Sequence, residues 1–271
     1  MNIINGVDIA FTDHDNKFEE QIDIKEGFMK HKTLILSIAL NGYQWMYQKE
    51  LKSHQQYAER FGYTYQAVTR PYVSVLGVEC CWLKLTLIRK ALLSGYDTVL
   101  FLDADTMVNT NCPALDKVLC KDKYIYMAKG YSARFNSGVL IAKNNKQTIS
   151  WLTKVINAQF DKVQNENDVG WGENGHVIEL SKNVNFVQEL DQKWNNTFDY
   201  HLKDYIRHRN CGPMRTGYLN NFFHKVVFFL SARILAFVNS NPRPSDKKTV
   251  ETALSCETNK IISIYPKLVC S

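Results

Sequence analysis

The strongest constraint on the fold is an alternation of strand-like and helix-like segments in the N-terminal half of the chain. Continuous apolar runs of strand length, typical of strands covered on both faces, alternate with segments whose apolar residues recur at helical spacing. The expected strands cover residues 33–40, 63–69 and 97–102, and the expected helices cover residues 43–61 and 82–93. Connections this short predict an α/β fold with an open, mostly parallel sheet flanked by helices.

Two aspartates, Asp103 and Asp105, directly follow the third expected strand. Ligands of open α/β sheets bind beyond the carboxyl ends of the strands, and an unpaired carboxylate is costly to bury. We therefore expect both side chains in a polar crevice, where convergent carboxylates favour Mn²⁺ or Mg²⁺. Such a cation can bridge the diphosphate of a nucleotide-sugar. The alternative, an aspartate that caps a following helix, is disfavoured because residues 106–108 do not continue as a helix.

The C-terminal half is less regular. A turn into another strand is expected over residues 134–142, a helix over 150–160, a glycine-rich entry into a short helix over 172–180, and a short strand over 205–208. The tail after residue 245 carries no clear pattern.

Composition excludes several classes of protein. With 45% hydrophobic and 22% charged residues the chain is globular, and a net charge of +6 over 271 residues is too weak to predict nucleic-acid binding. Seven cysteines without CxxC spacing indicate a reducing compartment rather than a disulfide framework. The N-terminus lacks the pattern of a signal peptide, so a cytoplasmic location and a bacterial or viral origin are expected.

Three regions are expected along the chain. Residues 1–31 form an acidic leader, residues 32–221 the catalytic domain, and residues 222–271 an apolar helix and tail. The apolar stretch 222–238 is too short and too charged to predict a membrane span. Burial against the domain or a second copy, and peripheral contact with a membrane surface, both stay open.

Four motifs occur in the order found in a known family. They are YAERFGY at residues 57–63, WLKL at 82–85, GYDTVLFLDAD at 95–105 and FNSGV at 135–139. Together they resemble the GT-A fold glycosyltransferases, most closely the glycogenin-like families and the fungal and plant α-galactosyl- and xylosyltransferases. The resemblance spans residues 33–212 and implies a Rossmann-like GT-A domain, here with a helical C-terminal appendage.

The resemblance also implies a metal site. Asp103 would contact the ribose or sugar of the donor and join Asp105 at the metal. The third ligand in these families is a histidine near a glycine, and His208, four residues before Gly212, matches with a spacing one residue longer. His224 is the substitute candidate, and a plain core or surface histidine is the alternative for either.

Further donor contacts are implied at four positions. Lys84 resembles a helix lysine that reaches the donor near the metal, and Asn136 would face the sugar. Tyr43 could stack on uracil, and Ala39 lies at the end of the first expected strand. Each of three residues has a structural alternative: Lys84 could be an exposed lysine on a helix, Asn136 an asparagine that forms a turn, and Tyr43 a packed helix residue.

The acceptor side is expected around residues 171–174. This segment resembles both the (D/E)Q helix entry of the α-galactosyl- and xylosyltransferases and a WGGE element, with Asn174 where glutamine is usual. Glu173 could be a general base, as inversion requires, or could stabilise oxocarbenium charge during a retaining reaction. Asp168 is the competing candidate for this role. The structural alternative for both residues is an acidic side chain that stabilises the dipole at a helix N-terminus. Residues 190–195 resemble an element that lines the sugar pocket.

The sequence therefore predicts a metal-dependent glycosyltransferase. It would move a sugar from a nucleotide-diphosphate donor, UDP-linked by resemblance, to a glycan or glycoconjugate hydroxyl, and retention of configuration is favoured. A haloacid-dehalogenase-like phosphatase using Asp103 and Asp105 is one rival, although that family places its motif on the first strand of its core. A non-catalytic sugar-binding module of the same fold is the other.

Overall fold

The structure is a computed structural model that describes residues 31–170, 172–209 and 247–270, together with Met214, Val226 and Leu230. The elements below belong to the compact unit Lys32–Ser271. The expected boundaries after residues 31 and 221 fall at the edge of the described residues or outside them and stay predictions.

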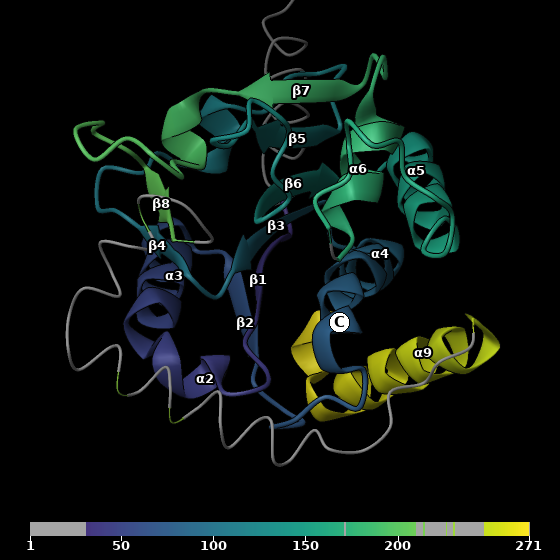
Figure 1. Ribbon diagram of the computed structural model, residues 1–271. Coiled ribbons are helices and arrows are strands. Elements are labelled where there is room, and N and C mark those ends of the chain that lie inside the picture. The colour runs from purple at the N-terminus through teal and green to yellow at the C-terminus, as the bar shows by residue number, and fades with distance from the viewer. Residues whose placement is uncertain are drawn as a thin grey trace, which may run out of the picture. The chain divides into compact units, whose positions relative to one another are not determined.

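One mixed sheet forms the centre of this unit. Its six strands are β1 (Thr33–Ile38), β2 (Thr64–Val68), β3 (Thr98–Asp103), β5 (Ile125–Ala128), β6 (Val139–Lys143) and β7 (Val187–Leu190). They are arranged in the order β2-β1-β3-β6-β5-β7 (Figure 1). β1 is parallel to both β2 and β3, β6 is antiparallel to β3 and β5, and β7 is parallel to β5. The parallel strands β2, β1 and β3 confirm the expected arrangement. The strands β5 and β7 were not expected from the sequence.

Helices cover both faces of the sheet (Figure 1). They are α2 (Tyr43–Met46), α3 (Gln48–Phe61), α4 (Leu83–Leu93), α5 (Lys146–Asn157), α6 (Asn174–Ser181) and α9 (Lys247–Ile264). α3 lies on one side, and α4 and α5 lie on the other. The single helix expected over residues 43–61 is interrupted at Tyr47, and α5 begins four residues earlier than expected because the Asn145 side chain caps it.

The apolar run in β3 is continuous because both faces of the strand are buried. Val99 and Phe101 belong to the core under α4 and α5, whereas Leu100 and Leu102 belong to the core under α3. All four side chains are at most 1% exposed, and each contributes about 1.5–3 kcal/mol through burial. The strand is thereby held from both sides, and its last residue, Asp103, emerges at the carboxyl edge of the sheet.

A second, two-stranded ladder lies next to that edge. β4 (Thr106–Val108) pairs antiparallel with β8 (Ile206–His208), and Thr106 stands opposite His208. The backbone N–H of Arg209 also donates to the carbonyl of Asp105 at 3.2 Å. This long-range pairing brings the expected strand around residues 205–208 to the aspartates.

The C-terminal segment is an integral part of the core, although its sequence gave no clear pattern. α9 lies beside α4 (Figure 1), and Leu254, Ile261 and Leu268 are buried in the same cluster as α4 and α5. The Tyr265 hydroxyl accepts a hydrogen bond from the backbone N–H of Thr69 at 2.9 Å. The helical appendage is thus present, whereas the stretch 222–238, for which a helix was expected, lies outside the described residues except for Val226 and Leu230.

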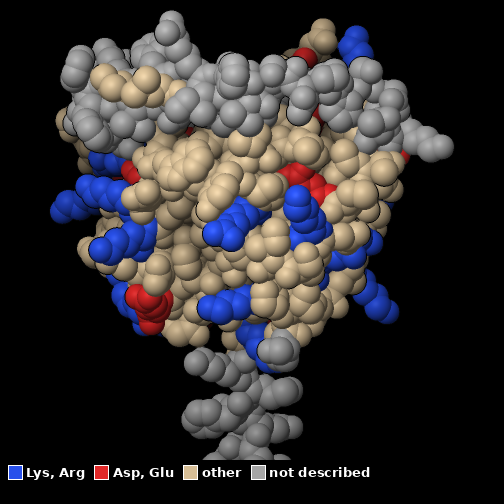
Figure 2. All heavy atoms as spheres, turned by 90° about the horizontal axis from the view of Figure 1, so that it is seen from below, with Lys and Arg blue, Asp and Glu red and all other residues tan. Residues whose placement is uncertain are grey.

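Three expectations about the chemistry of the chain can be compared with the described residues. Within them, no helix is long and apolar enough to span a bilayer. All six cysteines whose state the structure describes are free thiols. On the face seen in Figure 2, lysines and arginines stand in separate groups with uncharged residues between them, as suits a modest net charge of +6.

Candidate active site

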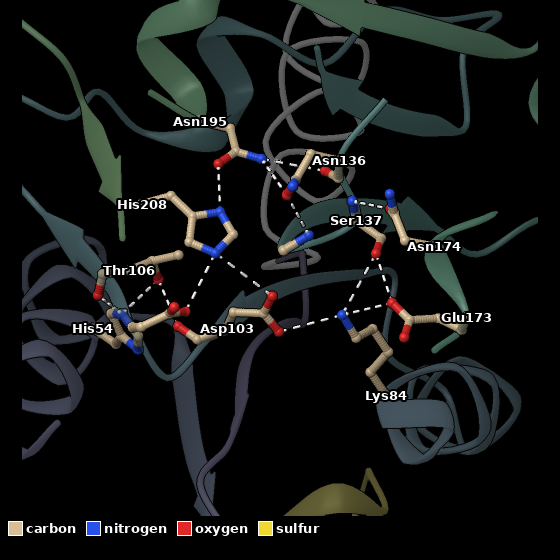
Figure 3. Close-up of polar contacts among 12 residues, drawn as sticks. His54, Lys84, Asp103, Thr106, Asn136, Ser137, Glu173, Asn174, Asn195 and His208 are labelled. Carbon is tan, nitrogen blue, oxygen red and sulfur yellow. Dashed lines mark hydrogen bonds and ion pairs between the residues drawn. The ribbon is translucent and has the colours of Figure 1, made fainter. Parts of the chain in front are cut away.

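Three side chains converge where β3 ends. Asp103, Asp105 and His208 each offer one ligand atom, and these atoms lie within 4.8 Å of one another. His208 Nε2 lies 3.2 Å from Asp105 Oδ1 and 3.7 Å from Asp103 Oδ2. The pairing of β4 with β8 brings His208 to the end of β3, where its ring faces Asp103 (Figure 3). The Asp105 carboxylate approaches the same ring nitrogen from the turn between β3 and β4.

The ligand atoms that this cluster offers suit a divalent cation. His208 is 1% exposed, and its Nε2 is buried without a hydrogen-bond partner among the described residues. A carboxylate oxygen only accepts, so a ring nitrogen without a proton needs a cation between it and the aspartates. Two carboxylates with one imidazole nitrogen suit first-row divalent ions such as Mn²⁺. The residues present therefore fit the metal that the resemblance implies.

Gly138 forms the wall behind these ligands. Its carbonyl accepts a hydrogen bond from the backbone N–H of Asp103 at 2.8 Å. A β-carbon on Gly138 would stand 2.1 Å from His208 Cε1 and 2.6 Å from Asp103 Oδ2. Only glycine lets the strand approach the ligands this closely, which explains the glycine of the FNSGV motif.

Lys84 links Asp103 to Glu173, the residue expected on the acceptor side. Its Nζ lies 3.2 Å from Asp103 Oδ1 and 2.8 Å from Glu173 Oε1 (Figure 3). The same atom lies 4.9 Å from the centre of the Phe101 ring. The Ser137 hydroxyl donates to the same Glu173 oxygen at 2.6 Å. The side chains of Lys84 and Glu173 are 6% and 4% exposed, so this is a buried ion pair and not the exposed helix lysine of the alternative interpretation.

Lys84 and Glu173 hold each other in the ionised state. Burial lowers the pKa of the Lys84 ammonium, but the carboxylates of Asp103 and Glu173 outweigh burial and raise it. Burial raises the pKa of Glu173, but Lys84 and the Ser137 hydroxyl outweigh burial and lower it. For Asp103 burial dominates, and its pKa is raised despite the neighbouring Lys84 and His208.

Two asparagines shape the turn before β6. Asn174 Oδ1 accepts from the backbone N–H of Ser137 at 2.8 Å, and Asn174 Nδ2 donates to the carbonyl of Phe135 at 3.2 Å. Asn136 Oδ1 accepts from the backbone N–H of Gly138 at 3.0 Å. Both predicted residues therefore lie at the site, and their described contacts hold the loop that carries Gly138.

The other predicted residues lie apart from this network. Asp168 is exposed, and its Oδ1 accepts from the backbone N–H of Gly170 at 2.7 Å. Ala39 is fully buried just after β1, and Tyr43, 37% exposed, begins α2. These two lie at the carboxyl edge of β1, the strand next to β3. His224 and Gly212 lie outside the described residues.

Sequence reasoning missed a second buried histidine that supports the aspartates. His54 in α3 donates through Nε2–H to the carbonyl of Thr106 at 2.7 Å and accepts from the Ser37 hydroxyl at Nδ1, 2.8 Å away. The Thr106 hydroxyl donates in turn to the carbonyl of Asp103 at 2.7 Å. Burial lowers the pKa of His54 to about 4, although Thr106 and Asp105 act in the opposite direction. No local pattern around residue 54 signals this role.

Asn195 belongs to the element expected to line the sugar pocket, and it contacts His208. Its Oδ1 lies 2.8 Å from His208 Nδ1. Asn195, Asn196 and Thr197, which form a glycosylation sequon, are at most 1% exposed. The sequon is therefore inaccessible in the folded protein.

Comparison with known proteins identifies the fold. No protein-family model and no curated protein matches the sequence. The structure is similar to that of a glycosyltransferase involved in the glycosylation of the major capsid of PBCV-1, with 16% identity, coverage of 67% of this chain and 95% of that chain, and a TM-score of 0.53. The chain therefore has the GT-A glycosyltransferase fold that its motifs predicted.

Two further structures are similar at lower TM-scores. The apo form of the glycosyltransferase GlyE of Streptococcus pneumoniae matches at 16% identity over 85% of this chain and 64% of that chain, with a TM-score of 0.47. The galactosyltransferase LgtC, in complex with donor and acceptor sugar analogs, matches at 15% identity over 74% of this chain and 95% of that chain, with a TM-score of 0.43.

Proposed function

We propose that this chain is a divalent-metal-dependent glycosyltransferase. It transfers a sugar from a nucleotide-diphosphate donor, UDP-linked, to a hydroxyl of a glycan or glycoconjugate. The observation that carries the proposal is the convergence of Asp103, Asp105 and His208 at the carboxyl edge of β3 in a GT-A fold. That edge is where open α/β sheets bind their ligands.

The metal ligands would be Asp103, Asp105 and His208. A divalent cation held there, Mn²⁺ or Mg²⁺, supplies Lewis-acid stabilisation of the leaving nucleoside diphosphate. The two oxygens of Asp103 have different partners: Oδ1 faces the Lys84 ammonium, and Oδ2 faces His208. Lys84 thus fixes the orientation of a metal ligand and adds positive charge close to the diphosphate.

The environment of Glu173 supports retention of configuration. An inverting enzyme needs a general base whose pKa lies near the working pH. Glu173 Oε1 is instead committed to the Lys84 ammonium and the Ser137 hydroxyl, and its pKa is lowered. Asp168 Oδ1 accepts a hydrogen bond from the backbone N–H of Gly170. A carboxylate in an ion pair is a weaker base than a free one, so we propose a front-face reaction beside the Glu173 carboxylate.

The remaining contacts are proposed from sequence and position. We propose that Asn136 and Asn174, which hold the loop before β6, contact the transferred sugar. Tyr43 at the start of α2 and the backbone at Ala39 are proposed to contact the nucleoside. Contact of residues 222–238 with a second copy or with a membrane surface, and a cytoplasmic location, also stay proposals.

The rival functions have less support. The phosphatase would need its aspartates on the first strand of the core, but Asp103 ends β3, the third strand in chain order. A non-catalytic module would have no need of the Lys84–Glu173 pair, whose burial carries a desolvation penalty.

A panel of sugar nucleotides tests the proposal. Release of the nucleoside diphosphate is measured with Mn²⁺ and again with EDTA, in the presence of a mixture of monosaccharide and glycan acceptors. Release of UDP from one donor, dependent on metal, is the expected result and identifies the sugar. Release that persists in EDTA would contradict the metal requirement, and UDP binding without release from any donor would favour the non-catalytic module.

A further inference from the structure

We infer that Asn195 is a positioning residue that fixes which ring nitrogen of His208 carries the proton and thereby sets the metal affinity of the site. The inference rests on the proposed metal site and goes beyond it, because it concerns a residue that would not touch the metal. Figure 3 shows Asn195 between the His208 ring and Asn136.

A backbone N–H fixes the orientation of the Asn136 side chain. The N–H of Gly138 can only donate, and it lies 3.0 Å from a side-chain atom of Asn136. That atom must therefore be the oxygen, Oδ1. An amide group of Asn195 approaches the same Oδ1 at 3.0 Å and the backbone carbonyl of Asn136 at 3.2 Å. Both are acceptors, so the Asn195 atom that faces them is the donor Nδ2.

The orientation of Asn195 then determines the His208 tautomer. With Nδ2 turned to Asn136, Asn195 Oδ1 faces His208 Nδ1 at 2.8 Å. An amide oxygen only accepts, so the proton is on Nδ1. In the neutral imidazole, which has one N–H, Nε2 then carries the lone pair that faces Asp103 and Asp105.

This orientation is what a metal ligand requires. A histidine ligand binds through the unprotonated nitrogen, and the partner of the other nitrogen fixes the tautomer and the ring position. Asn195 is 0% exposed and His208 is 1% exposed, so bulk water cannot replace the amide. Without Asn195 Oδ1, the proton is free to move to Nε2, where it would block the metal.

Titration of Mn²⁺ alone, followed by the electron paramagnetic resonance signal of the free ion, tests the inference. Asn195→Ala should weaken Mn²⁺ binding about 10- to 100-fold, the range seen when such partners of metal ligands are removed. Asn196→Ala is the matched control, because Asn196 is also 0% exposed but its side chain binds Asp199 and Asp204 instead of His208. It should lose stability yet bind Mn²⁺ within about twofold of the wild type.

Nitrogen NMR of the metal-free protein gives a second readout that needs no metal. The wild type should show His208 protonated at Nδ1, and Asn195→Ala should show both tautomers. Mn²⁺ binding by Asn195→Ala equal to that of the wild type, or a wild-type His208 protonated at Nε2, would overturn the inference. Failure of the wild type to bind Mn²⁺ would instead overturn the proposed metal site, while the NMR result would still decide the tautomer.

Discussion

Gly138 and His208 are in such close contact that a β-carbon on Gly138 would stand 2.1 Å from Cε1 of the imidazole. Because Asp103 Oδ2 would lie only 2.6 Å from the same β-carbon, neither ligand has space to retreat without disturbing the other. One backbone position therefore controls the geometry of two of the three proposed metal ligands.

Gly138→Ala should consequently reduce Mn²⁺ affinity at least tenfold, in the range expected when ligand geometry is disturbed. Gly130→Ala is the control, since the nearest atom to its β-carbon would be Thr197 Oγ1 at 3.4 Å, and it should bind Mn²⁺ normally. Both affinities can be measured by Mn²⁺ titration. Equal affinities for the two variants would show that the ligands do not depend on this contact.

The buried pair of Lys84 and Glu173 should be strongly coupled to stability. Lys84→Met leaves the Glu173 carboxylate buried without its counter-charge, so we expect a loss of about 3–5 kcal/mol in the free energy of unfolding. Lys117→Met removes an exposed partner of Asp116 and should change stability by less than about 1 kcal/mol. Urea denaturation measures both.

A double-mutant cycle sharpens this prediction. If the Lys84 ammonium mainly stabilises the Glu173 carboxylate, the double variant Lys84→Met with Glu173→Gln should be less destabilised than the sum of the two single variants predicts. Strict additivity would mean that the two side chains act independently despite their 2.8 Å separation.

His54 should make the protein less stable in mild acid. Its pKa of about 4 in the folded protein lies below the ordinary 6.5, so between these values the unfolded chain binds more protons. Stability is therefore fully present above pH 6.5 and falls as the pH decreases toward 4, by about 3 kcal/mol in total. Denaturation across this window should show a flatter profile for His54→Gln, whereas His201→Gln, at an exposed position, should retain the wild-type slope.

The C-terminal helix α9 should stabilise the domain through its buried face. Ile261 is 0% exposed and Ile264 is 38% exposed on the same helix. Ile261→Ala should cost about 2–5 kcal/mol through lost burial and the cavity left behind, while Ile264→Ala should be nearly neutral. Thermal or urea unfolding compares the pair, and equal stabilities would contradict the packing of α9 against α4.

The sequence predicted the parts of this fold that rest on local patterns. The buried run of β3 and the carboxylates at its end could be recognised because periodicity and a short motif coincide there. His208 could be placed by resemblance alone, since its partner strand, β4, has only three residues and pairs across about 100 positions of sequence. Long-range pairing of short strands leaves little local signal.

Other roles depend on tertiary contacts that no pattern expresses. Asn195 was assigned to the sugar pocket from its motif, and its contact with His208 Nδ1 could not be predicted from the sequence. The contact of Glu173 with Lys84 is likewise not predictable from the sequence, because the two residues are about 90 positions apart. α9 was missed because half-buried helices that pack on an existing core need only a weak apolar face.

Calorimetric titration of UDP, with Mn²⁺ and with EDTA, tests the central claim most directly. The wild type should bind UDP with Mn²⁺ and lose at least tenfold in affinity with EDTA, and Asp105→Asn should show the weak affinity in both conditions. Asp116→Asn, at an exposed position, should behave as the wild type. UDP binding of equal strength with Mn²⁺ and with EDTA, unchanged in Asp105→Asn, would contradict a metal-dependent nucleotide-sugar site at Asp103, Asp105 and His208.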